Sequence, residues 1–163
     1  MKRESLKRLM EGSSGPRNQV AALCWRLHKG RVEVLLVTSR DTGRWVLPKG
    51  WPVDGRTAGG SAEVEAWEEA GVRGTARAEA LGYFSYDKVM TPDTALPCLV
   101  SVHALEVEGV ERRFPERKQR RRKWFEASRA ARKVAEPELR DLLERIAADP
   151  DAIHGQTGTD AGS

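Results

Sequence analysis

The chain has few of the residues that crosslink a fold or bind transition metals. Its 163 residues include only two cysteines and three histidines. A disulfide-rich secreted scaffold is therefore excluded, because such domains use cysteine densely. Cys24 and Cys98 lie in apolar, strand-like runs, so we expect two reduced thiols in a core. His28, His103 and His154 are scattered along the chain and indicate neither a zinc site nor a catalytic triad.

Long hydrophobic runs are also missing. No run approaches the roughly 20 apolar residues that span a membrane, and residues 1–12 lack the apolar segment of a signal peptide. With 39% hydrophobic residues, the chain can bury one core. We therefore expect a cytoplasmic protein without membrane contacts. We predict an N-terminal extension over residues 1–16, one domain over 17–148 and a disordered tail over 149–163.

The net charge of +4 is modest, but the charges are unevenly distributed. Residues 112–123, RRFPERKQRRRK, contain eight basic residues and a single acid, Glu116. Such a block favours a polyanionic partner. A nucleic-acid contact or a solvated loop are the alternatives, although the chain has no RNA-binding motif such as aromatic-rich strands. The sequence leaves the oligomeric state open.

The most informative segment is an acidic stretch followed by glycine. Glu65, Glu68 and Glu69 occupy positions i, i+3 and i+4, which share one face of a helix within an arc of about 100°. Like charges at this spacing weaken an isolated helix, whereas Mg²⁺ binds carboxylates and often shares its ligands with substrate phosphates. Gly71 is predicted to end the helix in a left-handed conformation. A solvated acidic face is the alternative reading.

Hydrophobic periodicity predicts a mixed α/β domain. The expected strands cover residues 19–27, 32–38, 45–47, 77–86, 96–107 and 123–125, with a loop at residues 90–94. The acidic helix is expected to begin near Thr57 or Ser61, whose hydroxyls are candidate N-caps, and to end at Ala70. Two further helices are expected at residues 129–134 and 136–148, the second with an apolar face.

The order of strand, Lys49, Gly50, polar loop and acidic helix resembles the Nudix box of the Nudix hydrolases, G-x5-E-x7-R-E-U-x-E-E-x-G-U, where U is aliphatic. The matching positions are Gly50, Glu65, Glu68, Glu69, Gly71 and Val72, with the small Ala66 at the first U. Two positions depart from the box. Arg56 stands where the box has its first Glu, and Val64 stands where it has Arg.

Segments outside the box extend the resemblance to roughly residues 17–146. Residues 34–40, 43–50 and 121–125 are similar to the diphosphoinositol polyphosphate phosphohydrolase-like branch and to its relatives that cleave diadenosine polyphosphates. The resemblance implies the Nudix α/β/α sandwich, a mixed β-sheet between helices. It also implies a metal-dependent hydrolase of pyrophosphate linkages in a polyphosphorylated small molecule. The two departures leave an alternative, a catalytically weak Nudix domain that binds a nucleotide or polyphosphate as a sensor.

The resemblance also implies a set of site residues. Glu65 and Glu69 are the expected principal ligands of Mg²⁺ or Mn²⁺, Glu68 completes the catalytic cluster, and the Gly50 carbonyl is an expected backbone ligand. The general base is Glu68 or a carboxylate outside the box. Family position suggests five basic residues as substrate ligands, which are Arg17, Arg26, Arg40, Arg44 and Lys49.

We further hypothesise that Arg56 reaches over the loop and orients the acidic helix in place of the missing box arginine. The alternative is that Arg56 faces solvent or a substrate phosphate. Lys88 and the basic residues 120–123 are weaker candidates for phosphate contacts. Trp51, Phe84 and Tyr86 are candidates for stacking on a base.

Overall fold

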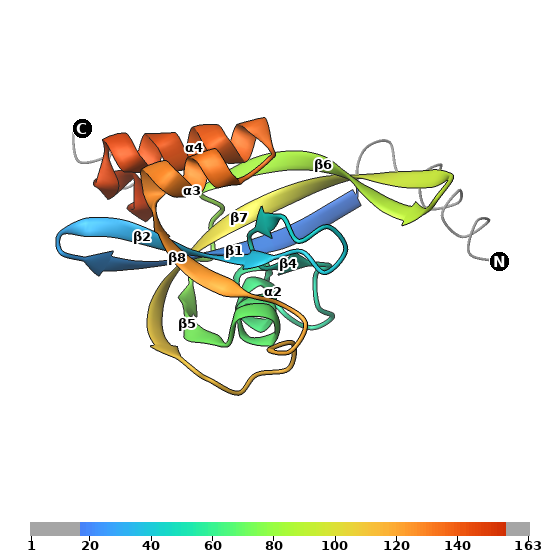
Figure 1. Ribbon diagram of the computed structural model, residues 1–163, viewed down its shortest axis with the longest axis horizontal. Helices are drawn as coiled ribbons and strands as arrows, with labels where there is room; N and C mark the ends of the chain where they lie inside the picture. Colours follow the sequence, from blue (N-terminus) through green and yellow to red (C-terminus); the bar gives the residue numbers. More distant parts are fainter. Residues whose placement is uncertain (1–16, 156–163) are drawn as a thin grey trace.

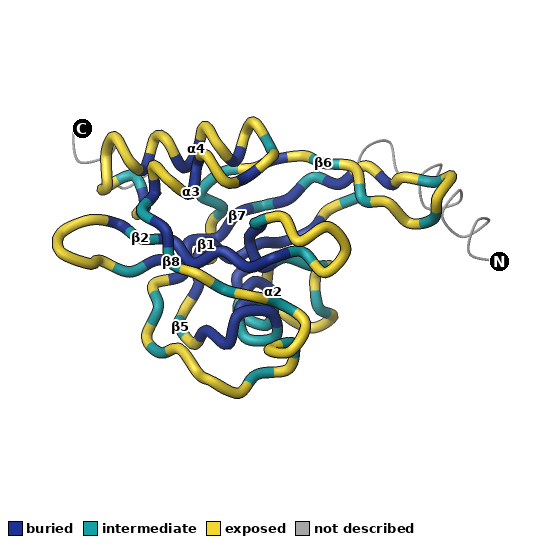
Figure 2. Tube along the Cα trace, in the orientation of Figure 1, coloured by how far each residue is buried: buried dark blue, intermediate teal, exposed yellow. Residues whose placement is uncertain are grey.

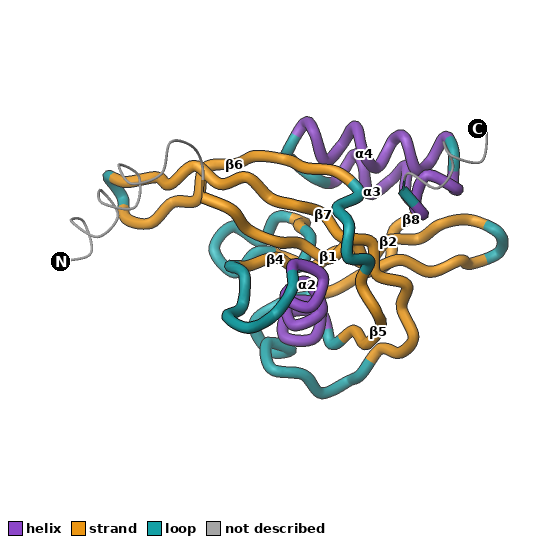
Figure 3. Tube along the Cα trace, turned by 180° about the vertical axis from the view of Figure 1, so that it is seen from behind, coloured by secondary structure: helices purple, strands orange, loops and turns teal. Residues whose placement is uncertain are grey.

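The computed structural model describes residues 17–155 as a sheet covered by helices on both faces (Figures 1 and 3). The predicted extension at residues 1–16 lies outside the described part, as do residues 156–163. The short helices α3 and α4 cover one face of the sheet and the acidic helix covers the other (Figure 1). The predicted α/β/α sandwich is confirmed.

The sheet is mixed and has eight strands. Its strands are β1 (Arg17–His28), β2 (Arg31–Thr38), β3 (Trp45–Val46), β4 (Lys49–Gly50), β5 (Val72–Ala76), β6 (Gly82–Thr91), β7 (Thr94–Val110) and β8 (Arg122–Glu126). The central path is β3-β2-β1-β7-β5, while β4 pairs with β1, β6 with β7 and β8 with β2. Strands β1 and β7 run parallel, and the other pairs run antiparallel.

The helical elements are α2 (Ala58–Glu65), η1 (Ala66–Ala70), α3 (Ala127–Lys133), α4 (Pro137–Ala148) and η2 (Pro150–His154). Side chains alternate across the central strand because successive residues of a strand face opposite sides. Ala21 and Leu23 of β1 therefore join the core under α3 and α4, and Ala22 and Cys24 join the core under α2. Both cores appear as buried stretches in Figure 2. No helix in residues 17–155 has the length and apolar content needed to cross a bilayer.

The region after the acidic helix differs from the sequence prediction. The first half of the strand predicted at residues 77–86 is a loop at residues 77–81, and the strand β6 begins only at Gly82. The preceding strand β5 was not predicted. The buried His103 fixes this loop, because its Nδ1 lies 2.9 Å from the Arg77 carbonyl oxygen and its Nε2 lies 3.0 Å from Ser101 Oγ. The predicted loop at residues 90–94 is largely strand, and only Pro92 and Asp93 lie between β6 and β7.

The tail predicted to be disordered begins with an ordered turn. Residues 150–154 form the 3₁₀-helix η2, in which the Asp149 carboxylate accepts a hydrogen bond from the Asp151 N–H at 3.3 Å. Ile153 is 1% exposed and belongs to the core under α4. A single apolar residue in a polar segment produces no periodicity, so the sequence pattern did not reveal this anchor.

Both cysteines match the sequence prediction. Cys24 and Cys98 are free and buried. Burial in the core under α2 raises the pKa of the Cys24 thiol to about 12. The thiol therefore stays protonated and packs as a small apolar side chain.

Candidate functional site

The acidic helix is fixed at both ends. Thr57 caps the N-terminus by accepting a hydrogen bond from the Gly60 N–H at 3.0 Å. Ser61, the other candidate cap, instead accepts from the Val53 N–H at 2.9 Å and ties down the preceding loop. At the other end Gly71 is left-handed, with φ of 68°, as the sequence predicted. These contacts hold the loop and the helix in a fixed relation to each other.

The last turn of the helix is wider than an α-helical turn. Residues 66–70 form a π-helical turn in which the Gly71 N–H reaches back to the Ala66 carbonyl. Such i→i+5 turns are rare and occur frequently at functional sites. The side chains of Glu65 and Glu69 meet across this turn and are hydrogen-bonded to each other.

Burial gives this carboxyl pair a raised proton affinity. It raises the pKa of Glu69 to about 8, and the hydrogen bond that protonated Glu69 donates to Glu65 contributes in the same direction. Burial also raises the pKa of Glu65. With no cation between them, two acids so close do not both ionise, and the pair holds a proton near neutral pH. A divalent cation can replace that proton, since hard oxygen donors are the ligands that Mg²⁺ prefers.

The backbone of β4 lies directly against the two carboxyl groups. The Lys49 N–H donates to Glu69 Oε1 at 3.4 Å. A Cβ atom at position 50 would lie 2.6 Å from Glu65 Cδ, so glycine is what allows the Glu65 carboxylate to sit against this strand. The donor set of Glu65, Glu69 and the Gly50 backbone therefore fits a divalent cation.

The third predicted ligand, Glu68, lies close enough to Glu65 for its negative charge to raise the pKa of that carboxyl group. It is half-buried, and its backbone carbonyl accepts a hydrogen bond from the Glu116 N–H at 3.0 Å. Within residues 17–155, no three His, Cys, Asp or Glu side chains are gathered as a ready-made metal site. The role of Glu68 as a metal ligand stays a prediction.

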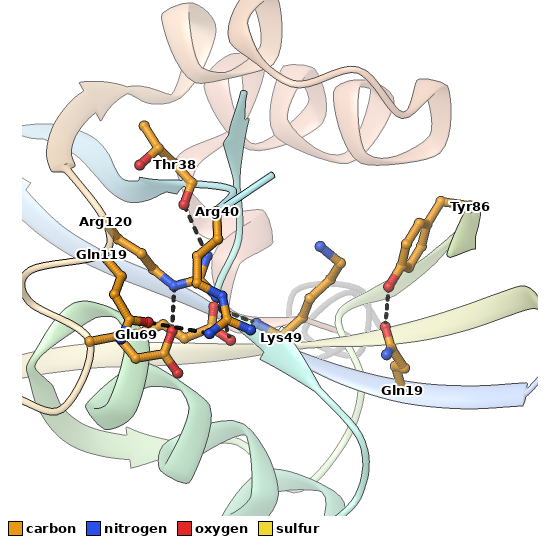
Figure 4. Close-up of polar contacts among 9 residues, drawn as sticks. Gln19, Thr38, Arg40, Lys49, Glu69, Tyr86, Gln119 and Arg120 are labelled. Atoms are coloured by element: carbon orange, nitrogen blue, oxygen red, sulfur yellow. Dashed lines mark hydrogen bonds and ion pairs between the residues drawn. The ribbon is translucent and has the colours of Figure 1, made fainter. Parts of the chain in front are cut away.

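Within the described residues, Arg120 is the basic side chain that pairs with Glu69 (Figure 4). Its Nη2 lies 3.6 Å from Glu69 Oε2, and its side chain is only 9% exposed. Two firmer contacts hold the guanidinium, with Nε donating to Glu116 Oε1 at 2.7 Å and Nη1 donating to the Thr38 carbonyl at 2.9 Å. The position of Arg120 therefore does not depend on Glu69.

The contact hypothesised for Arg56 is not found. Arg56 is exposed, and no ion pair joins it to the acidic helix in the described residues. Distance is the physical reason. Eight residues of α2 lie between Arg56 and the π-helical turn, and at about 1.5 Å per residue they span about 12 Å. Arg120 instead approaches Glu69 from the segment that leads into β8.

Lys49 and Arg40 are two of the predicted substrate ligands, and Figure 4 shows them together with Arg120. Lys49 is half-buried, and its Nζ lies 4.8 Å from the centre of the Tyr86 ring. Burial lowers the pKa of Lys49, and the charge of Glu69 opposes that shift. Arg40 is exposed, and its Nη1 donates to Gln119 Oε1 at 3.2 Å. Lys49 therefore lies beside Glu69, whereas Arg40 contacts Gln119, the neighbour of Arg120 in the chain.

The other predicted basic residues have local roles. Arg26 is opposite Glu33 in the β1–β2 register, pairs with it at 2.7 Å and stacks 4.0 Å above Trp124. Its charge is therefore used within the hairpin. Arg44 is exposed and donates to Thr42 Oγ1 in its own turn. Arg17 begins β1, opposite Cys98 of β7.

Sequence reasoning missed one polar side chain beside the site. Gln19 is 3% exposed, and its amide oxygen accepts a hydrogen bond from the Tyr86 hydroxyl at 2.6 Å (Figure 4). The only available signal was a polar residue at the start of an otherwise apolar strand. Arg120 was in the predicted basic segment, but nothing in the sequence separated it from seven similar neighbours.

The chain is similar to known proteins over most of its length. Residues 17–146 match the sequence profile of the NUDIX domain. The mitochondrial Nudix hydrolase 16 of Arabidopsis thaliana is 30% identical over 115 residues, which cover 69% of this chain and 63% of that protein. The human diphosphoinositol polyphosphate phosphohydrolase 3-alpha is 37% identical over 60 residues, which cover 37% of each chain. The match thus spans less than two thirds of these relatives.

Among solved structures, an Ap4A hydrolase from C. elegans has the same fold. It aligns with a TM-score of 0.58 and 19% identity, over 82% of this chain and 98% of that one. The profile match covers both faces of the sandwich and the whole acidic site described above. The chain belongs to the Nudix family.

Proposed function

We propose that the protein hydrolyses pyrophosphate linkages in a polyphosphorylated small molecule, of the diphosphoinositol polyphosphate or diadenosine polyphosphate type, with Mg²⁺ or Mn²⁺. The observation that carries this proposal is the pair of half-buried Glu65 and buried Glu69, packed against the Gly50 backbone with Arg120 and Lys49 beside it. The names of a human relative and of a structural neighbour support this substrate class.

Each residue has a task that follows from its position. Glu65, Glu69 and the Gly50 carbonyl hold the cation, and Glu68 completes the set from the same helix. When bound, the cation neutralises phosphate charge and lowers the pKa of a water molecule. The fixed positive charge of Arg120 opposes the effect of burial on the pKa of Glu69 and orients the carboxylate toward the cation. Lys49 and Arg40 bind phosphate oxygens and hold the anhydride bond over the acidic pair.

Two carboxylates are candidates for the base that accepts a proton from the attacking water. Glu68 lies within the box motif. Glu116 lies outside it, and its negative charge raises the pKa of both Glu65 and Glu69, which indicates that it is close to them. We propose to separate the two by comparing Glu68→Gln with Glu116→Gln. Loss of the base lowers kcat with little change in KM.

A sensor that binds a polyphosphate without cleaving it is the second candidate. It is favoured by the departures at Arg56 and Val64 and by the absence of a gathered carboxylate triad in residues 17–155. The position of Arg120 beside Glu69 argues for the enzyme, because Arg120 supplies the positive side chain that is missing at Val64 in this chain's box.

A phosphate-release screen tests the proposal. The purified chain is assayed with Mg²⁺ and with Mn²⁺ on diadenosine polyphosphates, inositol pyrophosphates, linear polyphosphate, nucleotide sugars and capped or triphosphorylated RNA. Glu69→Gln serves as the inactive variant, and the exposed Glu144→Gln of α4 is the matched control. The proposal predicts turnover of a substrate with several phosphates. Tight binding with no turnover of any compound favours the sensor. The cytoplasmic location stays part of the proposal.

A further inference from the structure

Four arginines line a hollow outside the acidic site. Arg112, Arg113, Arg117 and Arg122 surround a volume of about 520 Å³, and they are its complete lining within residues 17–155. Its size lies within the range of about 300–1,000 Å³ typical of small-molecule sites. We call it the arginine hollow. The hydrolytic site proposed above uses none of these four residues.

The arginine hollow is built on the end of the acidic helix. The segment before β8 curves around that end and is tied to it by two backbone hydrogen bonds. The Glu111 N–H donates to the Gly71 carbonyl at 2.8 Å, and the Glu116 N–H donates to the Glu68 carbonyl at 3.0 Å. A third bond within the segment, from the Arg117 N–H to the Phe114 carbonyl at 3.2 Å, closes a turn. The arginines therefore project from a backbone that is held in place.

Arg122 forms the fixed wall of the arginine hollow. Its Nη1 donates to the Ala70 carbonyl at 2.6 Å, and its guanidinium lies 4.7 Å from the centre of the Phe114 ring. A Cβ at Gly71 would lie 2.5 Å from Phe114 and 2.7 Å from Arg122 Nη1, so glycine makes this approach possible. Burial lowers the pKa of Arg122. The fold thus holds a partly desolvated cation at this position.

The nearby acids do not neutralise the arginine hollow. Glu111 pairs with Arg73 at 3.5 Å, and Glu116 pairs with Arg120 at 2.7 Å. No ion pair joins an acid to Arg112, Arg113 or Arg117 in the part of the chain that the structure describes. Four converging positive charges repel one another unless an anion lies between them. Arginine is suited to phosphate in particular, because its forked N–H groups match two oxygens at once.

We propose that the arginine hollow binds an oligophosphate anion of three or more linked phosphates. One phosphate group carries about two negative charges, fewer than the four arginines supply, so a chain of phosphates matches them better. The anion is either a free oligophosphate or the distal phosphates of the hydrolysed substrate. Binding in the arginine hollow does not require the acidic site, so it can be measured without hydrolysis.

Calorimetry with inorganic tripolyphosphate and with orthophosphate tests this site directly. The measurements are made in EDTA, so that cation-dependent binding at Glu65 and Glu69 does not contribute. The test variant is Arg112→Ala/Arg113→Ala/Arg117→Ala, which leaves the anchored Arg122 in place. The control is Arg129→Ala/Arg132→Ala/Lys133→Ala, which removes the same charge from exposed positions on α3. Single Arg113→Ala and Arg117→Ala variants replace the triple variant if circular dichroism shows that it does not fold.

The wild-type protein is expected to bind tripolyphosphate more tightly than orthophosphate. The test variant is expected to bind tripolyphosphate at least about tenfold more weakly, because it lacks three of the four guanidinium groups that donate charge-assisted hydrogen bonds. The control is expected to change by less than about twofold. An equal loss of tripolyphosphate affinity in both triple variants would mean that binding depends only on net charge, and it would overturn the proposed site. Absence of tripolyphosphate binding to the wild-type protein overturns it as well.

Steady-state kinetics then identify the source of the anion. If the arginine hollow binds the substrate's own chain, the test variant raises KM more for substrates with more phosphates, and tripolyphosphate competes with them. If it binds a free oligophosphate, KM is unchanged for every substrate while the calorimetric loss remains. Failure to find any hydrolysis would contradict the proposed function and would leave the calorimetric result standing.

Discussion

Replacement of Arg120 is the most informative perturbation of this protein. We propose that Arg120 takes over the task of the missing box arginine and orients Glu69, because its guanidinium lies 3.6 Å from that carboxylate. Its guanidinium is 9% exposed and contacts Glu116, the Thr38 carbonyl and, more loosely, Glu69. In Arg120→Gln the charge disappears from a nearly buried position. Glu116 and Glu69 then lose the cation between them.

The expected loss of stability follows from these contacts. Removing one partner of a fully buried ion pair costs about 3–5 kcal/mol. The Glu116 side chain is 21% exposed and regains some hydration, so we expect about 2 kcal/mol for the metal-free protein. At about 2–4 °C per kcal/mol for a chain of this size, Tm falls by about 4–8 °C. Thermal unfolding in EDTA measures this change.

The effect on metal binding separates orientation from competition. If Arg120 orients Glu69, Arg120→Gln weakens Mg²⁺ binding by about 10–100-fold, the usual cost of losing a group that supports a ligand. Arg120→Lys keeps the charge without the forked geometry, so its Mg²⁺ affinity should lie between those of the wild-type protein and Arg120→Gln. Arg121→Gln, which changes the exposed neighbouring arginine, is the matched control. Calorimetric Mg²⁺ titration provides the readout. Tighter Mg²⁺ binding in Arg120→Gln would refute orientation, because it would mean that the arginine competes with the cation.

Three further predictions concern residues around the same site. Between the ordinary carboxyl pKa of 4.5 and about 8, the folded protein keeps a proton on Glu69 that the unfolded chain releases. The Tm of the metal-free protein should therefore fall as pH rises through this window. Glu69→Gln should flatten that dependence, and a Tm that rises with pH would contradict the prediction. Gly50→Ala places a Cβ 2.6 Å from Glu65 Cδ. Because the flexible carboxylate can move, we expect the variant to fold, but calorimetry should show Mg²⁺ affinity reduced about tenfold or more. An unchanged Mg²⁺ affinity would argue against Gly50 as part of the site. Arg56→Ala should change kcat, KM and Mg²⁺ affinity by less than about twofold, because exposed charges contribute little; a tenfold loss would restore the orienting role that the sequence suggested.

The sequence predicted the features that depend on local pattern. Alternating apolar residues in β1 and β2 predicted strands, and the apolar face of α4 predicted a helix. Gly71 was predicted as the left-handed end of the acidic helix because few other residues adopt positive φ. The carboxyl pair followed from helical spacing. These features need only neighbouring residues in the chain to specify them.

The features that were missed depend on contacts between distant segments. Arg120 meets Glu69 across 51 positions, and its two anchors come from Thr38 and Glu116. In the π-helical turn the Gly71 N–H is shared between the Ala66 and Trp67 carbonyls, and no residue type marks this arrangement in advance. In the sequence, Gln19 is a polar residue at the end of a strand, and only the pairing of β6 with β7 brings the Tyr86 hydroxyl to its side chain. In each case the geometry comes from packing, which the pattern of one segment does not encode.

The rate of phosphate release as a function of Mg²⁺ tests the central claim most directly. The measurement compares the wild-type protein, Glu69→Gln and the control Glu144→Gln on the best substrate found in the screen. The carboxyl pair is expected to hold the catalytic cation, so the wild-type and control rates should rise with Mg²⁺ and saturate together. The rate of Glu69→Gln should be lower by at least about 100-fold at every concentration. A Glu69→Gln protein that reaches the wild-type rate at saturating Mg²⁺ would contradict the account.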